Sequence, residues 1–327
     1  MTQIQAYIPK VSILIPVYNR KDYIAECIQS ALNQTFMDFE VVVVDNDSED
    51  GTWEICRQFA ATDHRVRIFQ NDTNIGPVRN WLVCVEKAQG EFGKILFSDD
   101  LMFPKFLEHT LPYLEDPEIG FVSTAALIGE SPDNAVVFYA APTELQKISS
   151  KRYFNLLIPR KQSQIPYSPG AALFRMADIR ANLRVEIPTK IPRDFSKNGA
   201  GPDVLLFTLT ALSYKTVMMI SQAEVFFRSH PGSFATLDTG NEVTEGYRAA
   251  IAWFCKTQLT ERHWASYVAR IWLADINKTR AVILPSKYLC RYEGTGFLSE
   301  TISVVLSILR LVASNVLIFL KACVYKS

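Results

Sequence analysis

Short apolar runs alternate with amphipathic segments through the first hundred residues. The apolar runs lie at 11–16, 39–44, 66–69 and 95–97. Runs of this length and composition are typical of buried parallel strands. The segments between them carry apolar residues at helical spacing, which predicts a helix capped by Asp22 and further helices over 52–61 and 78–88. We therefore expect strand, loop and helix to repeat three times.

Such a repeat implies an α/β fold whose mostly parallel sheet is joined by right-handed crossovers. Two later apolar segments extend the pattern, a strand at 120–125 and a helix at 204–212. From Gly240 onward the pattern is helical and rich in aromatic residues, which is typical of a helical packing layer. The length of 327 residues allows one large domain or two smaller ones.

Carboxylates directly follow two of the predicted strands. Asp99 and Asp100 end the run at 95–97, and acids and turn formers at 45–52 end the run at 39–44. Ligands of open α/β sheets bind beyond the carboxyl ends of the strands, and carboxylate oxygens suit a Mg²⁺ or Mn²⁺ ion that holds a substrate phosphate. The alternative is an ordinary turn, in which Asp-Asp is common. This half of the chain has no Gly-x-Gly-x-x-Gly or P-loop pattern, which argues against a dinucleotide fold or a P-loop enzyme.

Composition narrows the class of protein further. The 34 Lys and Arg residues balance 34 Asp and Glu residues, so no overall field attracts nucleic acid. Six cysteines are scattered without a Cys-x-x-Cys pair, which argues against a zinc site or a disulfide framework and fits a reducing compartment. The first ten residues lack the basic and then apolar pattern of a signal peptide.

The segment 302–320 is apolar except for one charge, Arg310, and a few hydroxyl and amide residues. A membrane span is disfavoured, because an arginine near the centre of a span costs roughly 2.5–3.5 kcal/mol. The polar residues fall on one narrow helical stripe; they are Ser303, Ser307, Arg310, Ser314 and Lys321. A wide apolar face beside a thin cationic stripe favours a helix that lies in a membrane interface. Packing of that face onto the protein's own core is the alternative.

Four segments together resemble the signatures of family 2 glycosyltransferases in their order and spacing. They are Ile15-Pro16-Val17-Tyr18-Asn19, the stretch at 43–52, Asn74-Ile75-Gly76 and Ser98-Asp99-Asp100. The resemblance implies the GT-A fold, a Rossmann-like, mostly parallel sheet flanked by helices that binds a nucleotide sugar. It implies a catalytic domain over 1–238, divided near 128 into a nucleotide-sugar half and an acceptor half. A helical extension would follow over 239–296, and then the amphipathic segment 297–327.

The same resemblance assigns roles to individual residues. Donor-binding residues would be Pro16, Val17, Tyr18, Asp45, Asp47, Gly76, Arg79, Asn80, Ser98 and Arg228. Ligands of Mn²⁺ or Mg²⁺ would be Asp99, Asp100 and His230, while Gly170 and Ala171 would lie on the acceptor side. One departure is Phe97, which stands where members often carry the first acid of the Asp-x-Asp motif. Metal binding would then depend on fewer carboxylates, which weakens it.

Asp203 follows a Gly- and Pro-rich loop at the start of the predicted helix 204–212. The resemblance makes it the catalytic base, because inverting transfer needs a carboxylate that takes the proton of the attacking hydroxyl. The alternative is a helix cap, since a carboxylate is favourable at a helix start. Asp194 is the second candidate for the base.

These expectations combine into one hypothesis. The chain would be an inverting glycosyltransferase that moves a sugar from a nucleoside-diphosphate sugar to a hydroxyl of a lipid-linked glycan or an oligosaccharide. It would act in surface-polysaccharide synthesis, such as O-antigen or capsule, as a peripheral protein at the cytoplasmic face of the plasma membrane. One rival is a sugar nucleotidyltransferase, which would need a Gly-rich basic loop where this chain has residues 16–19. The other is an inactive glycan- or nucleotide-binding relative, which Phe97 suggests.

Overall fold

The computed structural model describes residues 8–139, 146–158, 165–233, 242–279 and 302–310, with single positions at 291, 292, 294 and 300. The chain divides into two compact units. The first comprises Met1–Glu186 and Asp194–Val243, and the second comprises Ile187–Arg193 and Thr244–Ser327. The short segment 187–193 therefore groups with the second unit, although it interrupts the predicted catalytic domain.

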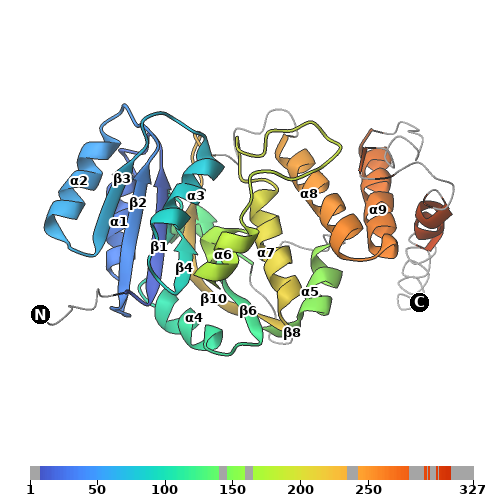
Figure 1. Ribbon diagram of the computed structural model, residues 1–327, viewed down its shortest axis with the longest axis horizontal. Helices are drawn as coiled ribbons and strands as arrows, with labels where there is room; N and C mark the ends of the chain where they lie inside the picture. The colour runs from blue at the N-terminus through green and yellow to red at the C-terminus, as the bar shows by residue number, and fades with distance from the viewer. Residues whose placement is uncertain are drawn as a thin grey trace, which may run out of the picture. The chain divides into compact units, whose positions relative to one another are not determined.

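Four parallel strands form one half of the sheet in the first unit, in the order β3-β2-β1-β4 (Figure 1). They are β1 (Val11–Val17), β2 (Phe39–Asp45), β3 (Val66–Gln70) and β4 (Phe92–Ile95). β1 pairs with β2 up to Val17 opposite Asp45, and with β4 on its other side. The parallel order predicted for this half is confirmed. Its consequence is that the carboxyl ends of these strands meet at one edge of the sheet.

The remainder of the sheet mixes strand directions, which the hydrophobic pattern did not predict. β9 (Ala172–Arg175) lies antiparallel between β4 and β6 (Ile119–Gly129), and β10 (Thr216–Arg228) runs parallel to β6 with register shifts. Three short strands add antiparallel pairs, namely β5 (Leu101–Met102), β7 (Ala135–Phe138) and β8 (Lys147–Ser149). The prediction of a mostly parallel sheet therefore holds for β1 to β4 and for the long β6–β10 pair, whereas β9 and the three short strands pair antiparallel. An antiparallel strand needs no crossover helix. The hydrophobic pattern of the sequence therefore carries no helical signal that would have indicated the position of β9 between β4 and β6.

Helices cover both faces of this sheet (Figure 1). They are α1 (Ile24–Leu32), α2 (Thr52–Thr62), α3 (Pro77–Lys87), α4 (Phe106–Leu114), α5 (Ser150–Leu157), α6 (Met176–Asn182) and α7 (Pro202–Ser213), with short 3₁₀ turns η1 (Pro132–Asn134) and η3 (Pro169–Ala171). Gly93 and Lys94 are neighbours on β4 and so point to opposite faces. A Cβ on Gly93 would meet Met176 and Ile179 of α6, whereas Lys94 Nζ lies 5.0 Å from the ring of Phe106 on α4. α6 and α4 therefore pack on opposite faces.

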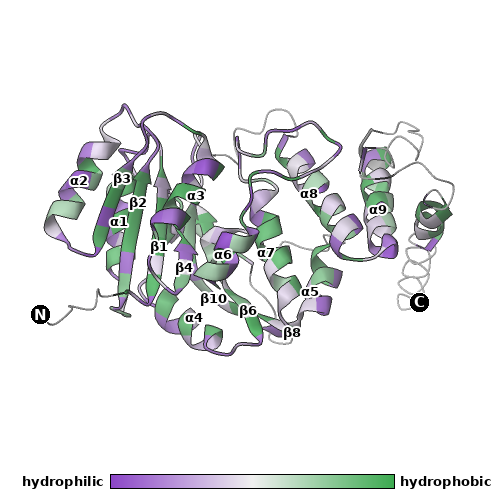
Figure 2. Ribbon diagram, in the orientation of Figure 1, coloured by the Kyte–Doolittle hydropathy of each residue, from purple (hydrophilic) through white to green (hydrophobic). Residues whose placement is uncertain are grey.

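Burial on both faces explains why β1 and β2 are apolar along nearly their whole length. Figure 2 shows these central strands as hydrophobic ribbons. Glu40 of β2 is a buried carboxylate within this apolar run. It accepts hydrogen bonds from Ser12 Oγ at 2.6 Å and from Arg67 Nη1 at 2.5 Å. A buried charge is tolerated only with such partners.

Two local features of the elements differ from the sequence-based expectations. Tyr23 rather than Asp22 occupies the N-cap of α1, and no side chain caps that end of the helix. β4 ends at Ile95, so the segment 96–98 leaves the strand before Asp99 is reached. Asp99 therefore lies in a turn beyond the sheet edge, where a ligand could reach it.

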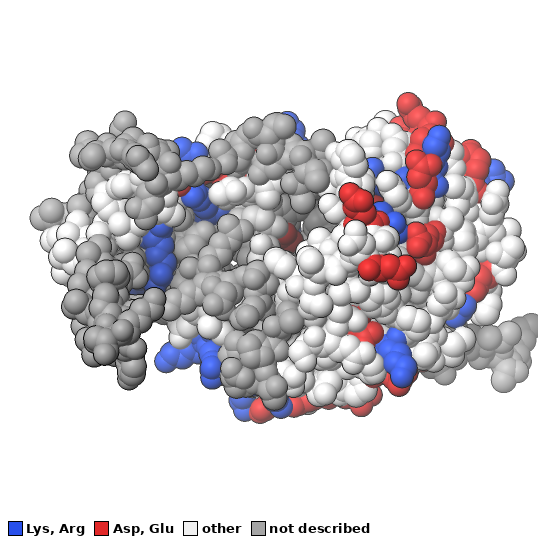
Figure 3. Space-filling model, turned by 180° about the vertical axis from the view of Figure 1, so that it is seen from behind, with Lys and Arg blue, Asp and Glu red and all other residues white. Residues whose placement is uncertain are grey.

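Charges of both signs share the surface of the first unit. On the face drawn in Figure 3, Lys and Arg side chains are interspersed with Asp and Glu side chains. Exposed pairs such as Lys215 with Glu118 and Lys147 with Asp116 contribute little to stability, because water screens them.

The second unit is helical, as expected for the C-terminal extension. It contains most of α8 (Glu242–Gln258), then α9 (Glu261–Thr279) and a helical segment at 302–310. Arg248 binds Asp275 at 2.8 Å, which joins α8 to α9. Within the described ranges, no helix has the length and apolar content needed to cross a membrane.

Candidate active site

The loops after β1 and β2 are tied together at the carboxyl edge of the sheet. Pro16 and Val17 are buried inside β1, and Tyr18, which follows, is 42% exposed. Asn19 has a positive φ of 49°, its amide donates to Ser48 Oγ at 2.9 Å and its Oδ1 accepts from Glu49 N at 3.0 Å. The edge thus presents an exposed tyrosine ring beside two loops that these hydrogen bonds join.

Asp45 ends β2 and is fully buried. Its Oδ1 accepts from Ser48 Oγ at 2.5 Å, and its Oδ2 accepts from Ser48 N at 3.1 Å and Gln70 Nε2 at 3.0 Å. Asp47 is half-buried with a positive φ of 66°. Sequence reasoning missed Ser48 and Gln70, although both lie just beyond the ends of predicted strands.

The loop after β3 docks onto a distant segment through α3. Gly76 has φ +85°, and a Cβ there would lie 3.1 Å from the carbonyl oxygen of Ser196. Arg79 is exposed and donates from Nη1 to Ser196 Oγ at 2.6 Å. Asn80 instead points inward, donating to Val44 O at 2.9 Å. Ser196 was not anticipated, because it is more than a hundred residues away in sequence.

Asp99 and His230 meet beyond β4 and β10. His230 Nε2 lies 2.9 Å from Asp99 Oδ2, and Arg20 Nε donates to the same oxygen at 3.3 Å. Asp99 and His230 fit a divalent cation as one carboxylate and one imidazole ligand, with other positions left for phosphate oxygens and water. Within the described ranges, no cluster of three or more His, Cys, Asp or Glu side chains of metal-binding geometry occurs.

Asp100 faces the other way. It is buried, and its Oδ1 accepts from the amide of Arg228 at 2.9 Å. Burial raises the pKa of the Asp100 carboxyl well above its usual value, and the neighbouring charge of Asp99 raises it further. The Arg228 side chain donates to Asp99 O at 3.0 Å and to Glu26 at 2.6 Å. The structure therefore places Asp100 and Arg228 in the support of the turn, with Ser98 buried beside them.

Phe97 joins an aromatic cluster instead of presenting an acid. Its ring centroid lies 5.2 Å from that of Trp81 on α3. A Cβ on Gly170 would lie 2.9 Å from Phe227 and 3.3 Å from Phe97, and one on Gly199 would lie 2.3 Å from Trp81. The rings therefore contact both the turn that carries Gly170 and Ala171 and the loop that precedes α7.

Asp203 lies in the first turn of α7 and is 7% exposed. Its Oδ1 accepts from the amides of Gly201 at 3.0 Å and Val204 at 2.6 Å, as a carboxylate at a helix start commonly does. Asp194 is exposed, and hydrogen bonds from Ser196 lower the pKa of its carboxyl. The two candidate bases thus lie on either side of the stretch that contacts α3, where Arg79 bonds Ser196 and Trp81 lies against Gly199.

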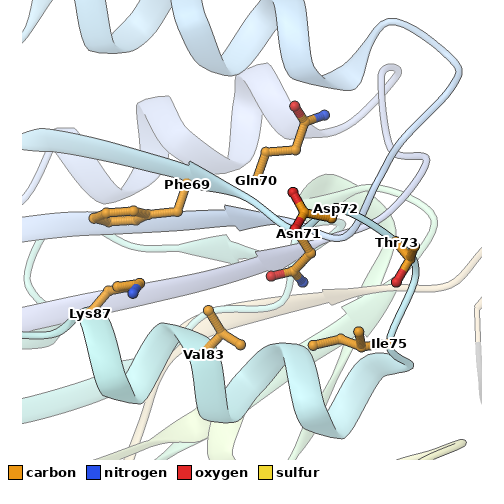
Figure 4. A pocket seen from close by; sticks show the side chains of 8 residues that line it. All are labelled: Phe69, Gln70, Asn71, Asp72, Thr73, Ile75, Val83 and Lys87. Carbon is orange, nitrogen blue, oxygen red and sulfur yellow. The ribbon is translucent and has the colours of Figure 1, made fainter.

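A hollow of about 450 Å³ lies beside this edge, between the loop after β3 and α3 (Figure 4). Its lining residues are Phe69, Gln70, Asn71, Asp72, Thr73, Ile75, Val83 and Lys87. The predicted site residues are not among them. A second hollow of about 530 Å³ includes Arg79 and Arg184 in its lining.

Comparison with known proteins agrees with the family that the sequence motifs indicate. The model of glycosyl transferase family 2 matches residues 12–181. The chain is 31% identical over 138 residues to the putative teichuronic acid biosynthesis glycosyltransferase TuaG of Bacillus subtilis, covering 42% of this chain and 55% of that protein. It is 28% identical over 129 residues to glycosyltransferase GlyG of Streptococcus pneumoniae, covering 39% and 43%. The chain thus spans roughly half the length of these relatives or less.

Solved structures agree on the fold. S. aureus TarS 1–349 in complex with UDP superposes with a TM-score of 0.59 at 19% identity, covering 85% of this chain and 77% of that one. Its complex with UDP-GlcNAc gives a TM-score of 0.58. The family model covers more than half of the chain, and the motif loops it contains gather at one edge of a GT-A sheet. The chain therefore belongs to glycosyl transferase family 2.

Proposed function

We propose that this protein is an inverting glycosyltransferase that uses a nucleoside-diphosphate sugar. The observation that carries the proposal is the Asp99–His230 contact, 2.9 Å long, at the edge where the Asp45 loop and the Tyr18 loop also end. A nucleotide would bind along these loops, with the open ring of Tyr18 beside the base and Arg79 near the phosphates. Uridine nucleotides are the first donors to test, because TarS was solved with UDP and with UDP-GlcNAc.

In the proposed reaction an acceptor hydroxyl attacks the anomeric carbon of the donor. Its proton passes to the Asp203 carboxylate, and the carbon–oxygen bond to the diphosphate breaks with its electron pair leaving on the diphosphate. The position of Asp203 at the start of α7, next to the loop that Trp81 contacts, supports this role. Asp194 remains the second candidate. A divalent ion bound by Asp99 and His230 would offset negative charge on the diphosphate. Arg20, which contacts Asp99, would add positive charge at the same place.

The acceptor would bind against the turn of Gly170 and Ala171. We propose a hydroxyl of a lipid-linked glycan or an oligosaccharide, in the synthesis of a cell-surface polysaccharide such as O-antigen or capsule. The similarity to TuaG, whose name places it in teichuronic acid biosynthesis, supports this direction.

Donor turnover tests the proposal. The protein would be incubated with UDP-, GDP- and dTDP-sugars, with and without Mn²⁺, and free nucleoside diphosphate would be measured. We expect turnover of one donor class, its loss in Asp203→Asn, and nucleotide binding unchanged in that variant. Equal loss of binding and turnover in Asp203→Asn would contradict the assignment of the base.

The second candidate function is an inactive glycan- or nucleotide-binding relative. The apolar surroundings of Phe97 favour it, because they replace one carboxylate of the metal motif with an aromatic ring. Retained nucleotide binding without turnover of any donor would support this candidate over the enzyme.

We also propose that the segment 297–327 holds the protein peripherally on an anionic membrane surface, at the cytoplasmic face. In the described part, 302–310, Ser307 is buried and Ser303 Oγ donates to Glu261 at 3.1 Å. Four large apolar side chains are exposed, with Ile302, Val305, Leu306 and Leu309 at 49%, 41%, 45% and 59%, whereas Val304 is buried. From residue 301 to the end of the sequence the chain has basic residues and no acids. An exposed apolar face beside cationic residues suits an anionic lipid interface.

Vesicle flotation tests the membrane proposal. The double variant Leu306→Glu with Leu309→Glu should lose most of its binding to phosphatidylglycerol vesicles, because two carboxylates would enter the lipid interface. The matched control replaces Val136 and Val137, two exposed valines of β7, by glutamate and should still float. Equal flotation of both double variants would refute the assignment of this face. Residues 297–299, 301 and 311–327 of this segment lie outside the described ranges.

A further inference from the structure

A single buried lysine lies beneath the turns that form the proposed site. Lys94 is a residue of β4 and is fully buried in a strand that is otherwise apolar. Its ammonium donates hydrogen bonds to the carbonyl oxygens of Ile95 at 2.7 Å and Gly170 at 2.5 Å, and lies 5.0 Å from the ring of Phe106. A buried ammonium is costly unless its donors are used. These contacts therefore indicate a specific role for the cation at this position.

The contact with Gly170 links β4 to the turn directly before β9, which is the turn proposed to lie on the acceptor side. Gly170 belongs to the 3₁₀ turn η3 and lies seventy-six residues after Lys94 in the sequence. Its carbonyl oxygen accepts the hydrogen bond from the Lys94 ammonium. The other side of the same glycine is closed by rings, since a Cβ there would lie 2.9 Å from Phe227 and 3.3 Å from Phe97. The turn is thus held by an ammonium on one side and aromatic rings on the other. Loss of the ammonium would leave the Gly170 carbonyl without this donor.

The same ammonium bonds the carbonyl of Ile95, the last residue of β4, directly before the turn that carries Asp99 and Asp100. Burial lowers the pKa of Lys94 to about 7, and the nearby charge of Asp100 opposes this shift in part. Asp100 in turn accepts from the amide of Arg228, two residues before His230. The position of Asp100 therefore affects both Asp99, its neighbour in the chain, and the end of β10. Lys94 thus joins the end of β4, from which this turn leaves, to the turn at Gly170.

We propose that Lys94 is a positioning residue, whose buried ammonium holds the turn at Gly170 against the end of β4, from which the Asp99–Asp100 turn leaves. It contacts neither donor nor acceptor. This inference rests on the proposed transferase function for its catalytic consequence, while its structural consequence is independent of that function.

The test combines kinetics with hydrogen exchange. Lys94→Met keeps the length of the side chain but removes its charge and its donors. We expect kcat for hydrolysis of UDP-GlcNAc to fall by about 10- to 100-fold, as displacement of a site by ~1 Å does. The Kd for UDP should stay within about 3-fold, because the hydrogen bonds of Lys94 go to Ile95 and Gly170 and not to the loops after β1 and β2. Backbone amides at 97–101 and 168–172 should lose protection against exchange, while those at 39–45 keep it.

A matched control separates positioning from general stability. Val66→Ala also removes buried volume from the sheet, on β3, and should lower the melting temperature without a change in kcat. If Lys94→Met changes kcat no more than Val66→Ala does, or loses protection evenly through the first unit, the proposal is wrong. Should Lys94→Met not fold, Lys94→Arg takes its place, because its larger head keeps the charge and should displace the Gly170 turn. A wild-type protein that turns over no donor would contradict the proposed function, while the exchange pattern would still decide the role of Lys94.

Discussion

Replacement of Gly199 by alanine offers a sharp test of how the loop before Asp203 is held. The backbone of Gly199 does not have the positive φ that glycine alone favours, so alanine is allowed there by its own conformation. The added Cβ, however, would lie 2.3 Å from Cη2 of Trp81. The effect of this substitution therefore reports the contact between the loop and the ring.

The size of the effect follows from that distance. Carbon atoms in contact lie ~3.5 Å apart, so the loop or the ring must move by about 1 Å. Overpacking of this kind costs about 1–3 kcal/mol, which lowers the melting temperature by several degrees in a domain of this size. Because Asp203 is four residues away, a shift of the loop should also lower kcat by about 10- to 100-fold. The Kd for nucleotide should be nearly unchanged.

The assay measures donor turnover and thermal unfolding for four proteins: wild type, Gly199→Ala, Trp81→Phe and the double variant. Phenylalanine lacks the outer ring atoms that the new Cβ would meet, so the double variant should recover much of the kcat lost in Gly199→Ala. Wild-type kcat and melting temperature in Gly199→Ala would refute the reasoning, since the loop could then separate from Trp81 without consequence. A double variant no better than Gly199→Ala would show that the loss has another source.

Three further predictions concern the stability of the first unit. Burial lowers the pKa of Lys94 from 10.5 to about 7, so between these values the unfolded chain binds one more proton and the contribution of Lys94 to stability increases with pH. The free energy of unfolding of wild type relative to Lys94→Met, from urea titrations between about pH 7 and about pH 10, should therefore rise by up to ~1.4 kcal/mol per pH unit. A difference that stays constant with pH would contradict this prediction. Glu40→Ala should cost about 3 kcal/mol in urea, because Ser12 and Arg67 lose their buried acceptor, and a cost below ~1 kcal/mol would mean that water replaces it. Gly76→Ala should cost about 1–3 kcal/mol, since φ +85° with ψ 156° is accessible essentially to glycine alone, and an unchanged melting temperature would disprove this strain.

Sequence reasoning located the elements that carry the site. The runs at 11–16, 39–44 and 66–69 lie within one residue of the ends of β1, β2 and β3, because the signal for a strand buried on both faces is local. Parallel pairing of these strands then brought Asp45 and the turn of Asp99 to the same edge of the sheet, as expected. The resemblance to family 2 glycosyltransferases, carried by the four motif segments, is confirmed by the family match.

Side-chain direction was beyond the reach of the same reasoning. Adjacent carboxylates Asp99 and Asp100 look equivalent in sequence, yet one contacts His230 and the other is buried against Arg228. Asn80 was expected to face the nucleotide but donates to Val44 O. Each outcome depends on a partner distant in the chain, so no local pattern could predict it.

The sequence by itself determined the first strands and helices of the first unit, the acid at the end of β2 and the family, since these depend on local periodicity and on short motifs. Only the tertiary structure decided which acids are buried, that β9 lies antiparallel between β4 and β6, and that Lys94 contacts the turn at Gly170 and Trp81 the loop at Gly199. The physical reason is that exposure, charge pairing and steric contact depend on residues that come together only when the chain folds.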